Sequence, residues 1–438
     1  MGYTGYYQNT YEFINFSLTI NLRYNILKII SIIRKYFQRK IIKLHESGGQ
    51  QMGKGLLTGV TVIDLTRVLA GPYCSMFLAD MGANVIKVEM PGKGDDSRCY
   101  VPSFKGESAY FINLNRNKRS ITLNLKTEKG KMILKEMTKK ADILLENYRP
   151  GTMEKLGLGY DFLKEINPQL VYGCISGFGH YGPYKDRPGY DIISQAMGGL
   201  MSTTGWPDSG PTRSGTAIGD VLAGLSLAIG VLAAYINKEK TGIGQKVDVA
   251  LVDSVVSSLE IINQIYLAEG RVPQRIGNRY EAIYPYDSFM AKDGEIVIGA
   301  GNDKLFGLLA TLMGKPELID DDRFCNNTSR VKNHALLKPI IEEWLINFDM
   351  DESVDMILNV GVPAAPIYTI DKVVADPHIA GAREMFVTVK HPTAGDMKIC
   401  GNQIKLNNNP VSFERPAPLL GQHTQEILKE ILAIDEDE

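Results

Sequence analysis

One acidic residue, Asp220, stands between a glycine-rich polar segment and a long apolar run near the middle of the chain. The polar segment is WPDSGPTRSGTAIGD, residues 206–220, and the apolar run is VLAGLSLAIGVLAAYI, residues 221–236. The run is shorter than the roughly twenty residues that cross a bilayer, so it predicts a helix buried on all sides. Asp220 would lie at or near its N-cap, where free backbone N–H groups and the helix dipole keep a carboxylate ionised. Such a carboxylate can act as a nucleophile, although Asp is also a common N-cap residue with no chemical role.

The composition narrows the classes of function. The chain has 438 residues, enough for two or three domains, and its 44% hydrophobic content is that of a globular enzyme. A net charge of −2 gives no basic field, so we expect no nucleic-acid partner. The five cysteines form no CxxC pair, and the six histidines lack metal-ligand spacing. We therefore expect no metal and a reducing, cytoplasmic location.

Residues 1–51 differ from the rest of the chain in being basic and rich in Tyr, Asn and Ile. Apolar residues recur there at helical spacing, with Arg and Lys between them: Leu22, Ile26, Ile29, Ile33, Phe37 and Ile41. Three interpretations remain open: a basic amphipathic helix for a membrane surface, a mitochondrial presequence, or sequence upstream of a true start at Met52. None of them includes a segment that spans a membrane.

From about Leu56 onward, short apolar runs alternate with turns and helical patterns, which indicates an α/β fold with a parallel sheet. The runs VTVIDL, NVIKVE, ADILLE and VYGCIS begin at residues 60, 84, 141 and 171. The first two imitate a dinucleotide-binding unit, but the turn between them lacks G-x-G-x-x-G, so we do not expect NAD. Glu146 and Asn147 stand at the end of the third run, where strand ends often face the ligand crevice. His180, in the loop after the fourth run, is expected at the surface or behind the site rather than as a base.

Three basic residues, Arg116, Lys118 and Arg119, precede an alternating strand pattern at residues 120–125. Two interpretations fit them. They can form a solvated charged face, or they can form a dock for a polyphosphate, since Lys and Arg suit phosphate oxygens.

A series of motifs carries a resemblance that covers nearly the whole body of the chain. They are VTVIDLTRVLAGP, GANVIKVE, NRNKRSITLNLK, ADILLENYRPG, SGFGHYGPYKDRPGYD, GTAIGD, KTGIGQ and PLLGQHT. In this order, from about residue 56 to residue 432, they resemble the family III CoA-transferases, the CaiB/BaiF family that includes formyl-CoA transferase. Within this family, the sequence as a whole is most similar to members that transfer CoA between dicarboxylic acids, such as those of the succinyl-CoA:glutarate type.

The resemblance implies an α/β fold with a large, Rossmann-like parallel-sheet domain built from both chain ends and a smaller α+β domain. Residues 52–270 and 391–438 would form the large domain, and residues 271–390 the small one. In the second half of the chain, Asp293 and Gly294 are typical of a hairpin turn. Subunits of the family interlock in pairs, so the resemblance also implies a homodimer.

The family mechanism assigns the nucleophile to Asp220, which would attack an acyl-CoA thioester and form a mixed anhydride. The released CoA thiolate would then form an aspartyl-CoA thioester, from which the acceptor acid takes over the CoA. The implied substrates are an acyl-CoA, with succinyl-CoA or acetyl-CoA as donor, and a small carboxylic acid. No permanently bound cofactor is implied. Backbone N–H groups at residues 277–283 are a candidate oxyanion hole.

The resemblance also places the CoA contacts, position by position. They are Val68, Leu69, Leu123, Asn124, Leu125, Lys126, Asn147, Tyr148, Arg149 and Lys155. Lys155 stands where an Arg is usual, which keeps the charge but loses the bidentate fork. Met90 stands where formyl-CoA transferase has an Arg that contacts CoA. Arg187 and Arg213 are candidates for holding a second carboxylate of the acid.

Two alternative functions compete with CoA transfer. The α-methylacyl-CoA racemases share the family's fold and use a His and an Asp as bases, but here Tyr190 stands in the GYD motif where they carry the His. A tyrosine with a pKa of about 10 is a poor base at neutral pH. A non-catalytic CoA-binding protein is disfavoured because the nucleophile position retains Asp220.

Overall fold

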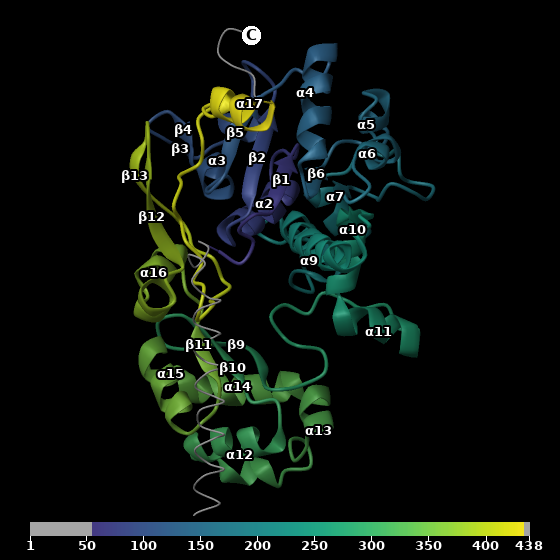
Figure 1. Ribbon diagram of the computed structural model, residues 1–438. Helices are drawn as coiled ribbons and strands as arrows, with labels where there is room; N and C mark the ends of the chain where they lie inside the picture. Colours follow the sequence, from purple (N-terminus) through teal and green to yellow (C-terminus); the bar gives the residue numbers. More distant parts are fainter. Residues whose placement is uncertain (1–54, 433–438) are drawn as a thin grey trace, which may run out of the picture. The chain divides into compact units, whose positions relative to one another are not determined.

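The computed structural model describes residues 55–432 (Figure 1). The chain divides into two units, Met1–Leu56 and Leu57–Glu438, and every element below belongs to the second unit. The extension at residues 1–51, with its three interpretations, lies outside the described residues.

A parallel sheet of six strands, in the order β5-β2-β1-β6-β7-β8, forms the first core. All of its neighbouring strands pair in parallel, which confirms the predicted α/β class. The chain runs outward from β1 to β2 and β5, and then resumes on the other side of β1 with β6. Ligands of open α/β sheets bind at such a switch point, here between β1 and β6. The strands are β1 (Thr61–Asp64), β2 (Asn84–Glu89), β5 (Arg119–Thr122), β6 (Ile143–Glu146), β7 (Val171–Ser176) and β8 (Lys246–Ala250).

Helices cover both faces of this sheet. On one face, α2 (Ala70–Asp80) and α9 (Ile218–Thr241) share a core with β1, β6 and β7. On the other face, α4 (Glu128–Lys139) and α6 (Tyr160–Ile166) share a core with α17 (Thr424–Leu432). The C-terminal part of the chain therefore lies beside α4 and β5, so that distant parts of the sequence build one domain (Figure 1).

A second core surrounds a three-stranded antiparallel sheet in the order β11-β10-β9. The hairpin predicted at Asp293 and Gly294 joins β9 to β10. This mixture of helices and antiparallel strands agrees with a smaller α+β domain, whose boundaries stay a prediction. Its strands and covering helices are β9 (Tyr286–Met290), β10 (Glu295–Gly299), β11 (Ala364–Pro366), α12 (Asp303–Leu312), α14 (His334–Leu345) and α15 (Met350–Asn359).

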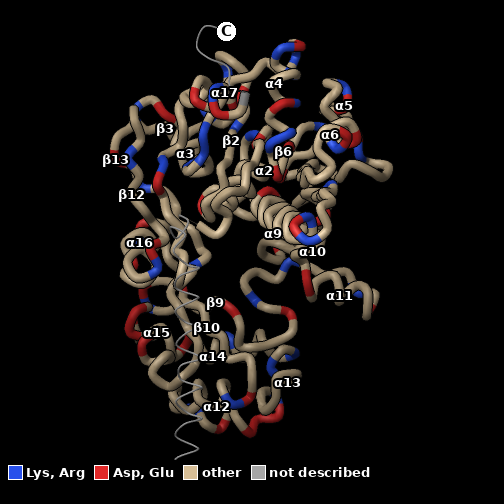
Figure 2. The backbone as a smooth tube through the Cα atoms, in the orientation of Figure 1, with Lys and Arg blue, Asp and Glu red and all other residues tan. Residues whose placement is uncertain are grey.

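The remaining elements are short, and Figure 2 shows that Lys, Arg, Asp and Glu are spread over many parts of the described chain. Two short hairpins pair β3 with β4 and β12 with β13. The short strands are β3 (Ser103–Phe104), β4 (Glu107–Ser108), β12 (Phe386–His391) and β13 (Gly395–Cys400). The short helices are η1 (Asp96–Cys99), α3 (Ala109–Leu114), α5 (Thr152–Lys155), α7 (Asp191–Met197), α8 (Leu200–Thr203), η2 (Pro316–Ile319), α13 (Asn327–Lys332), α16 (Ile370–Ala375) and η3 (Pro377–Ala382).

The central helix α9 differs from its prediction. It extends beyond the apolar run at both ends, and Ile229 and Ile236 on it are 70% and 54% exposed. The prediction of burial on all sides is wrong, because the sheet lies on only one side of the helix. By length and composition, α9 is the one helix among residues 55–432 that could span a membrane by itself. The bent pair of α10 (Leu251–Ser258) and α11 (Glu260–Glu269) passes that test only as a unit.

Candidate active site

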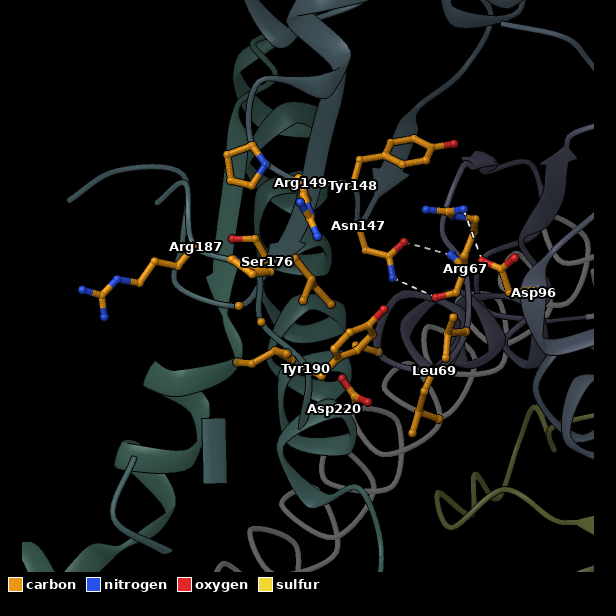
Figure 3. A pocket seen from close by; sticks show the side chains of 18 of the residues that line it. Arg67, Leu69, Asp96, Asn147, Tyr148, Arg149, Ser176, Arg187, Tyr190 and Asp220 are labelled. Carbon is orange, nitrogen blue, oxygen red and sulfur yellow. Dashed lines mark hydrogen bonds and ion pairs between the residues drawn. The ribbon is translucent and has the colours of Figure 1, made fainter. Parts of the chain in front are cut away.

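A cavity opens at the switch point of the parallel sheet (Figure 3). Its walls come from the segments that follow β1, β6 and β7 and from the beginnings of α9 and α10. Parallel strands end at the same edge of a sheet, which is why segments far apart in sequence meet here. The side chains drawn around it include Arg67, Leu69, Asn147, Tyr148, Arg149, Ser176, Arg187, Tyr190 and Asp220.

Asp220 lies in the first turn of α9 and lines this cavity, beside Tyr190 (Figure 3). The N-cap residue of α9 is Ala217, so Asp220 is not the capping residue itself. Within the part of the chain that the structure describes, no side chain or backbone group donates a hydrogen bond to its carboxylate. Its oxygens are therefore available to a ligand in the cavity.

Asp191 provides the acidic cap that the sequence assigned to Asp220. Oδ1 of Asp191 accepts hydrogen bonds from the backbone N–H groups of Gly219 and Asp220, at 2.8 and 3.4 Å. Oδ2 accepts from Nε2 of Gln195 at 2.7 Å, which fixes the carboxylate. Sequence reasoning missed this residue, although it directly follows Tyr190 in the GYD motif.

The pKa of Asp220 is raised to about 7, mainly by burial and further by the charge of Asp191. At neutral pH the carboxylate is therefore ionised in only about half of the molecules, so the helix N-terminus does not by itself keep it ionised as predicted. Desolvation and the negative charge of Asp191 outweigh the helix dipole. The dipole stabilises a charge near an exposed helix end by only about 0.3–1 kcal/mol in most cases. An acid with this pKa is, once ionised, a stronger base than an exposed carboxylate, and its nucleophilicity rises accordingly.

The structure brings two of the predicted CoA-binding segments to the same cavity as Asp220. They follow β1 and β6 and contribute Val68, Leu69, Asn147, Tyr148 and Arg149. The other predicted contacts do not line this cavity, and their role stays a prediction: Leu123, Asn124, Leu125, Lys126 and Lys155. Arg213 and the candidate oxyanion loop at residues 277–283 are also absent from its lining.

Asn147 links the two predicted CoA-binding segments to each other. Its Oδ1 accepts a hydrogen bond from the N–H of Arg67, and its Nδ2 donates to the carbonyl oxygen of Arg67, both at 2.8 Å (Figure 3). Arg149 adds positive charge to the lining, whereas the side chain of Arg187 points away from Asp220 (Figure 3), and its guanidinium lies 3.6 Å from the ring centroid of Tyr184. The cavity thus combines one acid of raised pKa with cations that suit anionic substrates.

A comparison with known protein families identifies the family of proteins to which this chain and its cavity belong. The sequence model of CoA-transferase family III matches residues 57–424, which include every segment that lines the cavity. The chain belongs to CoA-transferase family III. It is therefore a CoA-transferase, as the motif order predicted.

Curated relatives of this transferase align over most of both chains. The succinyl-CoA:glutarate CoA-transferase of Homo sapiens is 41% identical, and the alignment covers 87% of each chain. The succinyl-CoA–D-citramalate CoA-transferase of Chloroflexus aurantiacus is 40% identical, over 87% of this chain and 95% of the relative. The acetyl-CoA:oxalate CoA-transferase of Acetobacter aceti is 41% identical, over 87% and 97%.

Solved structures share the transferase's fold. A CaiB/BaiF family protein from Brucella suis superposes with a TM-score of 0.76 at 40% identity, covering 86% of this chain and 99% of that one. A protein from Mycobacterium tuberculosis gives a TM-score of 0.76 at 32% identity, over 84% and 98%. The parallel sheet and the small antiparallel sheets are thus those of the family.

The three basic residues before and at the start of β5, Arg116, Lys118 and Arg119, have another role in the transferase than either interpretation of the sequence. All three side chains are buried or nearly so and form ion pairs, so they are neither a solvated face nor an open polyphosphate dock. The pairs are Arg116 with Asp80 at 2.7 Å, Lys118 with Asp64 at 3.1 Å, and Arg119 with Glu426 and Glu430 at 2.7 and 2.6 Å.

Among residues 55–432, one group of side chains has atoms placed closely enough to share a metal ion: Glu146, Cys174 and His180, within 4.8 Å of one another. The Nζ of Lys246 lies 3.0 Å from Nδ1 of His180 and can only donate, so Nδ1 accepts and Nε2 carries the ring hydrogen. Nε2 faces Oε1 of Glu146 at 3.7 Å as a donor, which opposes metal binding. Glu146 also accepts from the N–H of Tyr148 at 2.7 Å, so the cluster holds the segment after β6 in place.

Proposed function

We propose that this transferase moves CoA from succinyl-CoA or acetyl-CoA to a short dicarboxylic acid, through covalent intermediates on Asp220. The observation that carries the proposal is the carboxylate of Asp220, unpaired and of raised pKa, in a cavity at the switch point of the sheet. The names of the curated relatives, which act on succinyl-CoA or acetyl-CoA and on dicarboxylic acids, support the substrate class. Arg149 in the lining suits substrates that carry negative charge.

The proposed reaction needs no net proton transfer. The ionised carboxylate of Asp220 attacks the thioester carbonyl of the donor, the C–S bond breaks, and CoA leaves as a thiolate from a mixed anhydride. The thiolate then attacks the carbonyl carbon of Asp220, which forms the aspartyl-CoA thioester and releases the donor acid. The acceptor carboxylate attacks this thioester in turn, its C–S bond breaks, and CoA leaves again as a thiolate from a second anhydride. The thiolate finally attacks the acceptor's carbonyl, which yields the new acyl-CoA and restores Asp220.

The binding of CoA is proposed to begin at the segments after β1 and β6 that line the cavity, from Val68, Leu69, Asn147, Tyr148 and Arg149. The segment at residues 123–126 and Lys155 would contact parts of CoA farther from the thioester. A homodimer is proposed on the family resemblance, and the mass of the native protein in solution tests it.

A panel of acids tests the substrate class. Succinyl-CoA and acetyl-CoA are each offered with glutarate, oxalate, succinate and, as controls of similar size, butyrate and valerate. We expect a dicarboxylate to be the best acceptor by at least about tenfold in kcat/KM, because a second carboxylate can pair with a lining arginine. Exchange of isotope-labelled succinate into succinyl-CoA detects CoA transfer even when the natural acceptor acid is not known. Equal rates for butyrate and glutarate would contradict the dicarboxylate proposal.

The raised pKa of Asp220 gives the activity a predicted pH dependence. Only the ionised carboxylate attacks, so kcat/KM should fall as the pH drops below about 7, by a factor approaching ten per pH unit. Asp191→Asn keeps an Oδ1 acceptor for the N–H groups of α9 but removes a charge that raises this pKa. In a plot of kcat/KM against pH, the fall on the acid side (the acid limb) should therefore lie at a lower pH for the variant than for the wild type. Asp208→Asn, in an exposed loop, is the control, and an unmoved limb in Asp191→Asn would contradict the role of Asp191.

A further inference from the structure

We infer that the buried Lys87–Asp95 ion pair positions one wall of the cavity, by holding Val68 in a left-handed backbone conformation. Val68 lines the cavity together with Asp220 and has a φ of 67°. A β-branched residue is a genuine outlier in this region, since its Cβ crowds the neighbouring backbone. Such a conformation persists only where the surrounding structure imposes it.

The ion pair makes the contact that imposes it. The N–H of Val68 donates to Oδ1 and Oδ2 of Asp95, at 3.1 and 3.3 Å. Nζ of Lys87 lies 2.9 Å from Oδ2 of Asp95, and both side chains are 0% exposed. The same Nζ donates to the carbonyl oxygen of Thr66 at 2.9 Å. One buried ammonium thus fixes the carboxylate that holds Val68 and also a backbone carbonyl two residues earlier.

The intervening backbone groups are fixed as well. The N–H of Thr66 donates to Oδ1 of Asp64 at 2.9 Å, and the side chain of Asn147 bonds both the N–H and the carbonyl of Arg67. From the N–H of Thr66 to the N–H of Val68, every backbone polar group is therefore bonded to a side chain. This over-determination is what a strained segment requires, and the strained residue Val68 lines the same cavity as Asp220.

The Lys87–Asp95 pair has a simpler alternative role, which the test must distinguish from the positioning of Val68. Asp95 also accepts from the N–H of Ser97 at 2.9 Å and caps η1, so its loss could merely loosen that turn. Only the positioning role depends on the backbone freedom of residue 68. Glycine adopts positive φ as readily as negative φ, whereas alanine does not. Val68→Gly and Val68→Ala therefore form a matched pair of backgrounds.

The experiment measures kcat and KM for the acyl-CoA donor after Asp95→Ala in three backgrounds: the natural Val68, Val68→Ala and Val68→Gly. The KM measurement rests on the proposed function, in which acyl-CoA binds in this cavity. We expect Asp95→Ala to raise KM about tenfold or more with valine and with alanine, but less than about threefold with glycine. Changes in kcat should be smaller than those in KM, because Asp220 is not displaced. An equal rise of KM in all three backgrounds would overturn the inference in favour of the η1 cap.

A second measurement does not depend on activity or on the folding of Asp95→Ala. With the ion pair intact, Val68→Gly should have a higher Tm than Val68→Ala, by about 2 °C, because glycine relieves the strain that alanine retains. At an unstrained position the order is the reverse, since glycine loses more conformational entropy on folding. A Tm of Val68→Ala equal to or above that of Val68→Gly would overturn the inference even if the enzyme used another acyl-CoA.

Discussion

Replacement of Asp220 by Asn should abolish CoA transfer, with a loss of about 10⁴-fold or more in kcat, and leave a folded protein. An amide oxygen is not a carboxylate nucleophile, so neither the anhydride nor the aspartyl-CoA thioester can form. Asp220→Ala should lose the same activity. If Asp220 had only a capping role, Asn would be nearly neutral, because Asn caps a helix about as well as Asp.

The structure makes this substitution a clean test of chemistry. α9 has Ala217 as its N-cap, and the first-turn N–H groups bond to Asp191, so Asn at position 220 removes no cap. The pKa of Asp220 in the folded protein is above its value in the unfolded chain. Between about pH 4 and 7 the folded state therefore binds more protons than the unfolded state. As a consequence, the wild type loses stability as the pH rises through this window. Asp220→Asn does not titrate. At pH 8 it should therefore be more stable than the wild type by roughly 2–4 kcal/mol, and the difference should vanish below about pH 3.

The covalent step has its own signature. The wild type mixed with acyl-CoA and no acceptor should gain the mass of a CoA adduct on the peptide that contains Asp220, and hydroxylamine should trap that carbonyl as a hydroxamate. Asp191→Asn serves as the matched control, because it alters a neighbouring carboxylate and keeps the nucleophile. An Asp220→Asn enzyme that still transfers CoA, with deamidation excluded by mass, would contradict the proposed mechanism.

The sequence predicted those features that depend on local pattern and on motif order. Apolar runs that ended in polar residues predicted parallel strands, and Asn147 indeed lies at a strand end beside the cavity. The position of Asp220 at the start of an apolar run predicted a helix start within a few residues. These predictions succeed because strand and helix periodicity are properties of neighbouring residues.

The features that failed depend on which distant residues meet. Asp191 is 29 residues before Asp220, and nothing in its local pattern shows that its carboxylate reaches the first turn of α9. The raised pKa of Asp220 follows from that contact and from burial, which the sequence does not contain. The exposed side of α9 was missed because an all-round apolar pattern predicts burial on every side, whereas the sheet covers one.

The basic residues before and at the start of β5 were also misread, because their partners lie far away in the sequence. Loss of one of these buried ion pairs is the second change for which we expect a large effect, here on stability. Arg116→Met should lower the free energy of unfolding by about 3–5 kcal/mol, because it leaves the carboxylate of Asp80 buried without a cationic partner. The side-chain amides of Asn117 and Asn402 are the remaining donors to this carboxylate. The side chain of Arg116 is 1% exposed, and its Nε and Nη2 donate to Asp80 at distances from 2.7 to 3.1 Å. Its Nη1 also donates to the carbonyl oxygens of Asn113 and Cys400, so it links α3 to β13.

A surface pair of the same chemistry provides the control. Arg323 and Asp321 are 2.6 Å apart, as close as the buried pair, but their side chains are 57% and 23% exposed. Arg323→Met should therefore change the free energy of unfolding by less than about 1 kcal/mol, because water solvates the charge that remains. Urea unfolding of both variants at pH 7 measures the contrast. Similar small losses in the two would show that Asp80 finds water or another cation, and that burial of Arg116 contributes little to the fold.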